Sequence, residues 1–254
     1  MQSRFWAIVI PLLVLATGAA RALTVANAAA PSPREFPPQV FLPHVTGGFC
    51  GPFRDTFDAP TGWYEGERES LLAERSDGEY RLRVNESGVI WFVGAPDCQR
   101  LESSAAVDAR WAGDPGNFYG LLFATAGRLD RAYLLAVNSE SGVWMVLKID
   151  DKGIDRVVPP TTNAAVRPGG AVNRLAVARE GERIILSVNG AAVGELADPA
   201  PDEPLGVGLA VAAYTYRTPA DARFDNFSHS GGRAGAPGAR GNLLLAGPEP
   251  PGEP

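Results

Sequence analysis

The chain has 254 residues, of which 45% are hydrophobic, so it can bury the core of one large domain or of two small ones. Its net charge is −6 and it contains no cluster of Lys or Arg. This composition argues against nucleic-acid binding and against a polybasic membrane contact, because both need gathered positive charge.

The first 28 residues have the pattern of a secretory signal peptide. Residues 1–4 contain one Arg, residues 5–20 are apolar, and Ala26-Asn27-Ala28 fits a small-residue cleavage site. The apolar stretch is shorter than the roughly 20 residues of a spanning helix, and Pro11 interrupts it. We therefore expect a secreted or cell-envelope protein with no further membrane contact; an uncleaved membrane anchor is the alternative.

Segments of biased composition flank the predicted folded part, residues 51–229. Residues 29–50 are rich in proline and predict an extended linker, while residues 230–254 are rich in Gly and Pro and predict a disordered tail. Cys50 and Cys98 are the two cysteines. In an exported protein such a pair is expected to form a disulfide rather than a catalytic or zinc site.

The folded part predicts strands almost throughout. Runs of alternating apolar and polar residues lie between turn sequences such as SDGE, NESG and REGE, and predict strands over residues 79–84, 88–93, 105–112, 118–126, 132–138, 143–150, 155–158, 173–179, 183–188, 191–196, 206–213 and 222–227. About twelve strands at this spacing predict one antiparallel sandwich or barrel. A helix of one or two turns is the expectation for SLLAER, residues 70–75.

The strongest local signal is Asn189-Gly190, between the apolar runs RIILSV and AAVGEL. A two-residue type I′ turn needs positive φ at both positions, which Asn tolerates and Gly adopts freely. We expect a tight hairpin there.

Several segments together resemble the concanavalin A-like lectin/glucanase jelly roll, in the form found in LamG-like and 3-keto-disaccharide-hydrolase-like exported bacterial proteins. They are DTFD, GEYRLRV, AVDARW, NFYGLLF, AYLLAV, GVWMVLKI, NRLAVAREGERIILSVNG and ARFDNF, in this order over about 175 residues. The resemblance implies an all-β, two-sheet jelly-roll sandwich. It implies little about function, since this fold carries lectins, hydrolases and structural modules.

A search for catalytic residues finds no enzyme motif. Glucanases of this fold place acidic residues in a Glu-x-Asp-x-(x)-Glu run on the concave sheet, and the chain has no such run. Glu65, Glu67 and Glu69 are the nearest acidic group and fit a solvated loop. His44 and His229 lack the G-x-S-x-G motif of a serine hydrolase.

A set of polar and aromatic residues is expected to line a ligand groove on the concave sheet. If Val107, Trp111, Met145 and Leu147 face the core, the opposite face carries Asp108, Arg110, Trp144, Lys148, Tyr214 and Tyr216. Aromatic rings stack on sugars and charged groups bind hydroxyls. The alternative is that Trp144 is buried and Asp108–Arg110 is an ordinary ion pair.

The resemblance also implies that the first and last strands are neighbours. Asp55 and Asp58 would then lie near Asp225 and form a candidate structural calcium site; the alternative is that Asp225 only caps local hydrogen bonds. No other cofactor is indicated.

These observations favour a monomeric, exported, non-enzymatic module that binds a polysaccharide or the cell envelope. A glycoside-processing hydrolase of the keto-sugar type would need a pocket with two or more carboxylates. A purely structural or adhesion module would instead bury Trp144 and its neighbours.

Overall fold

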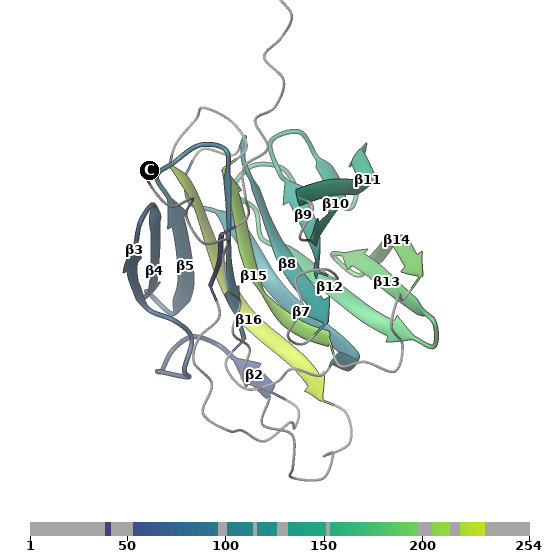
Figure 1. Ribbon diagram of the computed structural model, residues 1–254, viewed down its shortest axis with the longest axis horizontal. Helices are drawn as coiled ribbons and strands as arrows, with labels where there is room; N and C mark the ends of the chain where they lie inside the picture. Colours follow the sequence, from purple (N-terminus) through teal and green to yellow (C-terminus); the bar gives the residue numbers. More distant parts are fainter. Residues whose placement is uncertain are drawn as a thin grey trace, which may run out of the picture. The chain divides into compact units, whose positions relative to one another are not determined.

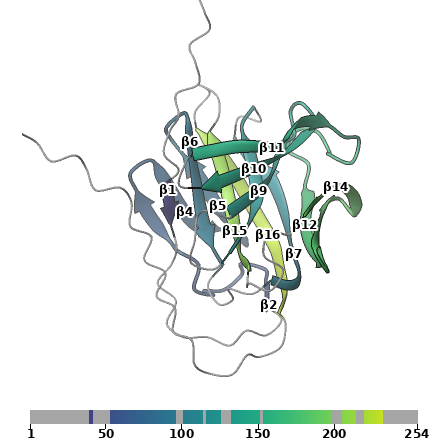
Figure 2. The ribbon, with the colours of Figure 1, turned by 45° about the vertical axis from the view of Figure 1, so that its right-hand side comes forward.

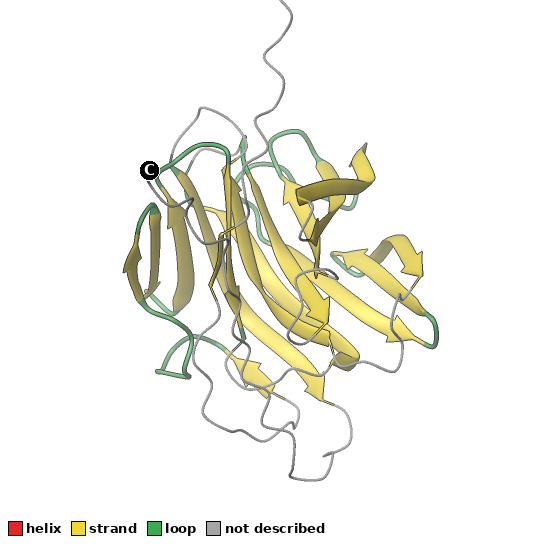
Figure 3. Ribbon diagram, viewed as in Figure 1, coloured by secondary structure: helices red, strands yellow, loops and turns green. Residues whose placement is uncertain are grey.

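The computed structural model describes residues 39–41, 53–95, 101–113, 116–125, 132–150, 153–197, 205–213 and 219–231. Within these ranges all regular structure is β, and sixteen strands form two sheets (Figures 1, 2 and 3). The predicted all-β sandwich is confirmed, with sixteen strands in place of about twelve. In the same ranges there is no helix that could span a bilayer.

Sheet A has seven strands, and all neighbours but one are antiparallel. Their order is β1 (Gln39–Phe41), β6 (Val89–Gly94), β15 (Leu205–Ala213), β8 (Phe118–Thr125), β9 (Ala132–Asn138), β10 (Val143–Asp150) and β11 (Gly153–Thr162). The exception is β1, which pairs in parallel with β6. Because β1 falls inside residues 29–50, the expected linker contributes a strand to the sheet.

Sheet B has nine strands and is antiparallel. Their order is β14 (Ala191–Ala197), β13 (Arg183–Val188), β12 (Asn173–Glu180), β7 (Leu101–Trp111), β16 (Ala220–Gly231), β5 (Glu79–Val84), β4 (Leu71–Ser76) and β3 (Gly66–Arg68), with β2 (Phe53–Asp55) pairing with β16. Strand β2, the first strand of the predicted folded part, is therefore a neighbour of the last strand, β16, as the resemblance implied.

The helix expected at residues 70–75 is wrong, because residues 71–75 belong to β4. All six of its residues pair with β5, from Leu71 opposite Val84 to Ser76 opposite Glu79. Leu71 and Ala73 are buried and alternate with more exposed residues, which is the period of a strand. Pairing with a neighbouring strand outweighs the helical preference of so short a segment.

The Asn189-Gly190 hairpin is confirmed. Asn189 has φ 52° and Gly190 has φ 81°, and Val188 pairs with Ala191 across the turn. The hairpin joins β13 to β14 at the edge of sheet B.

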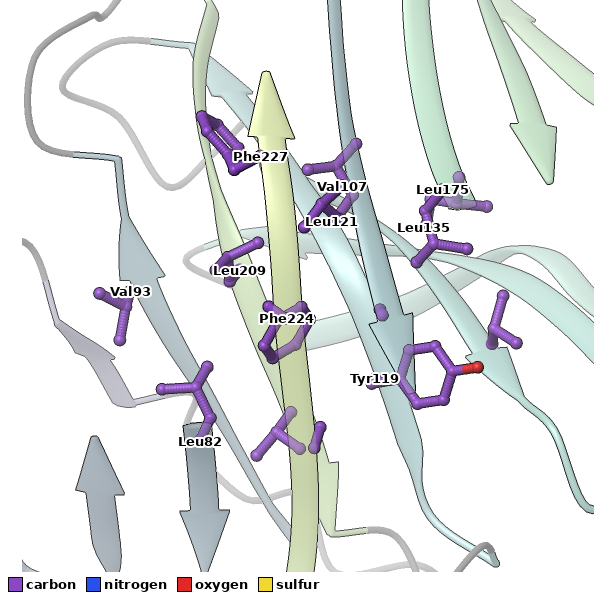
Figure 4. Packing of buried hydrophobic residues seen from close by; sticks show 14 of the residues in the cluster. Leu82, Val93, Val107, Tyr119, Leu121, Leu135, Leu175, Leu209, Phe224 and Phe227 are labelled. Atoms are coloured by element: carbon purple, nitrogen blue, oxygen red, sulfur yellow. The ribbon is translucent and has the colours of Figure 1, made fainter. Parts of the chain in front are cut away.

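The main core lies between the two sheets. Every second side chain of the central strands points into it. Figure 4 shows core residues from both sheets, among them Val107, Leu175, Phe224, Leu121, Leu135 and Leu209. These side chains are fully buried. The expectation that Val107 and Trp111 point into the core is correct, since Val107, Ala109 and Trp111 belong to it.

The expectation that Met145 and Leu147 point into this core, with Trp144 on the opposite face, is wrong. Trp144 and Val146 belong to the core between the sheets, whereas Met145, Leu147 and Ile149 belong to a second apolar cluster. That cluster lies on the other face of sheet A and also contains Ile90, Phe92, Leu122, Ala132, Leu134, Ala136, Ala210 and Ala212, each at most 5% exposed. This face therefore presents no open polar surface at these residues.

Candidate functional site

A shallow pocket lies on the face of sheet B that points away from the core. Its volume is about 110 Å³, and its lining residues are Glu79, Asp108, Ala109, Arg110, Val172, Arg223, Asp225 and Asn226. They come from β5, β7 and β16, except Val172, which directly precedes β12. Two of them, Asp108 and Arg110, belong to the predicted groove.

Strand register places like charges side by side in this pocket. Arg223 of β16 lies opposite Arg110 of β7, and Asp225 lies opposite Asp108. On the other side of β16, Arg223 also lies opposite Arg81 of β5. Like charges directly opposite each other destabilise a sheet unless neighbouring charges compensate them.

The guanidinium groups compensate most of the carboxylates. Arg110 donates two hydrogen bonds to Glu79, from Nε at 2.8 Å and from Nη2 at 2.6 Å. This contact raises the pKa of Arg110. Arg174 of β12 donates to Asp108 at 2.9 Å, and Arg223 lies 3.7 Å from Glu79.

Asp225 is the carboxylate that this arrangement leaves without an ion pair to any described residue. Its hydrogen bonds come from Asn226, from the backbone N–H at 2.6 Å and from Nδ2 at 3.0 Å. Partial burial raises the pKa of Asp225, the bond from the Asn226 backbone lowers it, and the charges of Asp108, Glu79 and Asp58 raise it further. A carboxylate of this kind at a pocket surface is open to a hydrogen-bond donor from a ligand.

Asn226 connects the two carboxylates that face each other. It has φ 50° and lies in an irregularity of the β16–β7 pairing between Asp225 and Ser228. From this position Nδ2 donates to both Asp225 Oδ2 and Asp108 Oδ2, each at 3.0 Å. The two carboxyl groups are thus held within two hydrogen-bond lengths of each other.

The structure does not bring the remaining predicted groove residues to this pocket. Trp144 is 4% exposed in the core, and Lys148 lies on β10 of sheet A with Nζ 2.6 Å from Asp150. Tyr214 and Tyr216 lie outside the described residues, as do Cys50 and Cys98. The expectation of one groove formed by Asp108, Arg110, Trp144 and Lys148 is wrong, because these residues belong to two different sheets.

Of the three aspartates of the predicted calcium site, Asp58 lies near enough to Asp225 for its charge to act on that carboxyl group, whereas protein donors engage Asp55. Asp55 is buried, where it accepts hydrogen bonds from Phe57 N at 2.7 Å, from Trp63 Nε1 at 2.8 Å and from Thr61 Oγ1. Asp58 is exposed and accepts from Thr56 at 2.8 Å. Across the described ranges, no three His, Cys, Asp or Glu side chains group closely enough to hold a metal ion.

Sequence reasoning missed Glu79, Asn226, Arg223 and Val172 as pocket residues. One signal for Asn226 was present. Phe224 and Phe227 are both core residues, so two residues separate them where a regular strand has one. This spacing is typical of a β-bulge, which re-aims side chains near binding sites.

No protein-family model matches the chain, and no curated protein matches its sequence. Solved structures do match its fold. An endo-acting O-glycanase of the human gut microbiota, which initiates mucin breakdown, is 13% identical with a TM-score of 0.53, over 71% of this chain and 99% of that one. The Crh5 transglycosylase is 12% identical with a TM-score of 0.54, over 73% and 87%.

A third similar structure is the β-glucanase of Bacillus licheniformis, 12% identical with a TM-score of 0.50, over 71% of this chain and 98% of that one. At these identities the likeness shows the fold alone. The chain thus shares the two-sheet β-sandwich fold of these structures, in agreement with the jelly roll that its sequence resembled. The activities on glycans belong to those three proteins.

Proposed function

We propose that this domain is a non-enzymatic glycan-binding module and that the pocket on sheet B is its binding site. The observation that carries the proposal is Asp225, a half-buried carboxylate with no ion pair to a described residue, fixed beside Asp108 by Asn226. Sugar hydroxyl groups donate hydrogen bonds, and the two oxygens of such a carboxylate can accept from a pair of them. Val172, which is exposed, supplies apolar surface for the C–H groups of a sugar ring.

The size of the pocket favours binding over catalysis. At about 110 Å³ it is smaller than the roughly 300–1,000 Å³ of a site that encloses a ligand. It takes one edge of a sugar and leaves the rest of the glycan in solvent. Together with the predicted signal peptide, this favours recognition of a polysaccharide at the cell envelope or outside the cell.

Affinity electrophoresis tests the proposal. The full chain is run through gels containing barley β-glucan, laminarin, xyloglucan, glycol chitosan or mucin. We expect retardation by at least one of these glycans, and its loss in Asp225→Asn. Glu195→Gln is the matched control, since Glu195 is an exposed carboxylate of sheet B that pairs with Arg183 outside the pocket. Equal retardation of wild type and Asp225→Asn would show that the glycan binds at another part of the surface.

A second candidate function is glycoside hydrolysis at Asp108 and Asp225. Retaining glycosidases hold two carboxyl groups about 5–5.5 Å apart. The shared bond to Asn226 Nδ2 keeps one oxygen of each aspartate within two hydrogen-bond lengths of the other, which is compatible with such a pair. A raised pKa suits Asp225 to the role of general acid. Shortening of a panel glycan by wild type but not by Asp225→Asn or Asp108→Asn would favour the enzyme.

The third hypothesis, a structural or adhesion module, predicted that Trp144 is covered, and Trp144 is buried. This burial excludes Trp144 as an exposed sugar platform but leaves the pocket on sheet B open. If no panel glycan retards the protein, and the protein shortens no panel glycan, the structural module would be favoured.

A further inference from the structure

The Asn189 side chain makes three hydrogen bonds that a tight turn does not require. Its Oδ1 accepts from the backbone N–H of Arg174 at 2.9 Å, and its Nδ2 donates to Ala165 O at 2.7 Å and to Asn173 Oδ1 at 2.8 Å. Glycine would adopt φ 52° without strain. The asparagine side chain therefore does more than permit the turn.

Asn173 continues this network into the core. It is fully buried, and its Nδ2 donates to Tyr119 Oη at 2.9 Å and to Arg167 O at 3.0 Å, while its Oδ1 accepts from Arg167 N at 2.8 Å. Burial raises the pKa of Tyr119 to about 12, so its hydroxyl is neutral and accepts the bond at physiological pH. The network fixes the start of β12 against both sheets.

The residues on either side of Asn173 point the other way, to the pocket face. Alternation along a strand places Val172 and Arg174 on the face opposite to Asn173. Val172 lines the pocket and is 42% exposed. Arg174 pairs with Asp108, which lines the same pocket. Two contacts of the pocket thus depend on where the start of β12 is held.

Building on the proposed function, we infer that Asn189 is a positioning residue of the glycan pocket. Through Arg174 N and Asn173 it sets the position of Val172, which contacts the apolar face of the sugar, and of the Arg174 guanidinium, which holds Asp108. The hairpin between β13 and β14 is then part of the binding apparatus, although its turn does not touch the ligand.

The test compares full-length Asn189→Gly, which keeps the turn, with Asn138→Ala. Asn138 is the matched control because its side chain also makes three hydrogen bonds, with Gly116 O, Ser141 N and Ser141 Oγ, but on β9 of sheet A. If Asn189→Gly does not fold, Asn189→Asp replaces it, since this variant keeps the acceptor for Arg174 N and loses only the two donated bonds.

Two measurements need no glycan. In Asn189→Gly we expect amide hydrogen exchange at residues 173–174 to rise about tenfold or more, the effect of losing about 1.4 kcal/mol of local stability. We also expect the pKa of Asp225, followed by NMR of its carboxyl carbon, to rise, because a displaced Arg174 compensates Asp108 less. Unchanged exchange and titration, or equal changes in Asn138→Ala, would overturn the inference.

The third measurement uses the panel polysaccharide among barley β-glucan, laminarin, xyloglucan, glycol chitosan and mucin that retards wild type most. We expect Asn189→Gly to bind it about tenfold more weakly and Asn138→Ala to bind it like wild type. Val172→Thr should weaken binding without changing hydrogen exchange or the pKa of Asp225. If Val172→Thr binds the glycan as tightly as wild type, Val172 does not contact the ligand. If none of the five binds wild type, the proposed function fails, while exchange and titration still decide the role of Asn189.

Discussion

Asp108 and Asp225 face each other across the β7–β16 pairing, and both accept a hydrogen bond from the same nitrogen, Asn226 Nδ2. Only Asp108 also has a guanidinium partner, Arg174, among the described residues. The two carboxylates therefore differ in charge compensation although they share one donor. This asymmetry distinguishes Asp225 from an ordinary surface acid and determines how the domain should respond to pH.

The first prediction concerns Asp225→Asn and the pH dependence of stability. The ordinary pKa of 3.8 is raised in the folded protein, so the folded state binds this proton more tightly than the unfolded state does. Stability then falls as the pH rises from 3.8 through the folded pKa, and the deficit persists at neutral pH. Asp225→Asn removes this deficit and should unfold at a higher urea concentration than wild type at pH 7.

At pH 3 the two proteins should differ less, since wild-type Asp225 is then largely protonated. Urea titrations at both pH values measure this. Glu195→Gln, at an exposed pair, should show no such dependence. An Asp225→Asn variant that is less stable than wild type at pH 7 would contradict the raised pKa.

The second prediction concerns Asp55. Its carboxylate accepts from Phe57 N and Trp63 Nε1, both in buried residues, and holds Phe57 at φ 55°, a conformation that a bulky residue rarely adopts. Asp55→Ala leaves two buried donors unsatisfied and should lower the free energy of unfolding by about 2–4 kcal/mol. Denaturant titration measures the loss.

The same titration tests the calcium hypothesis. With the Asp55 oxygens bonded to protein donors, we expect EDTA and added calcium to leave the unfolding midpoint of wild type unchanged. A midpoint that rises with calcium concentration would show that an ion binds the folded state. Asp58→Ala, at the exposed position, should be nearly neutral for stability.

The third prediction concerns Arg81, which holds a buried carboxylate on the neighbouring strand. Its Nε lies 3.0 and 3.1 Å from the two oxygens of Asp221, which is 5% exposed, and its Nη1 donates to Glu74 at 2.9 Å. Arg81→Met leaves Asp221 buried without its partner and should cost about 3–5 kcal/mol of stability. Thermal or denaturant unfolding measures the cost.

Glu74→Gln is the matched control for this pair. The Glu74 side chain is 37% exposed, so losing its ion pair should cost at most about 1 kcal/mol. Similar losses in Glu74→Gln and Arg81→Met would show that Asp221 does not depend on Arg81.

The sequence predicts sheet B better than sheet A because the outer face of sheet B is polar. Alternation between Val107 or Ala109 inside and Asp108 or Arg110 outside is visible in the residue types themselves. In sheet A both faces are apolar and buried, so strand β10 has no polar side chain at Met145 to mark its outer face. The alternation of residues along β10 then fits either face of the strand pointing into the core between the sheets, and the expectation for Trp144 took the wrong face.

The pocket could not be predicted from the sequence, for a different reason. It depends on which strands are neighbours and on their register, for example Asp108 opposite Asp225 and Arg223 opposite Arg81. Local patterns fix neither property for strands far apart in the chain. The parallel strand β1 was missed for the same reason, since it pairs with β6, which is distant in the chain. Strand β4 differs, because it pairs with the next strand, β5, across Asp77-Gly78, whose positive φ values are those of a type I′ hairpin and gave a local signal.

The fourth prediction concerns the contact of Trp144 with Gly194, which links sheet A to strand β14 of sheet B. A Cβ at Gly194 would lie 2.5 Å from the far end of the indole ring, at Cη2, so the ring occupies the space that a side chain would take. Gly194→Ala should therefore lower stability by about 1–3 kcal/mol through overpacking. Trp144→Ala should cost about 3–5 kcal/mol through the cavity that it leaves.

A double-mutant cycle separates this contact from general damage to the core. Trp144→Phe shortens the ring and vacates the space beside Gly194, so Gly194→Ala should cost clearly less in the Trp144→Phe protein than in wild type. Urea unfolding of the four proteins measures the coupling energy. Additive losses would show that the two residues do not compete for space. Because Trp144 is 4% exposed, glycan affinity should follow Asp225 and not Trp144 in variants that remain folded.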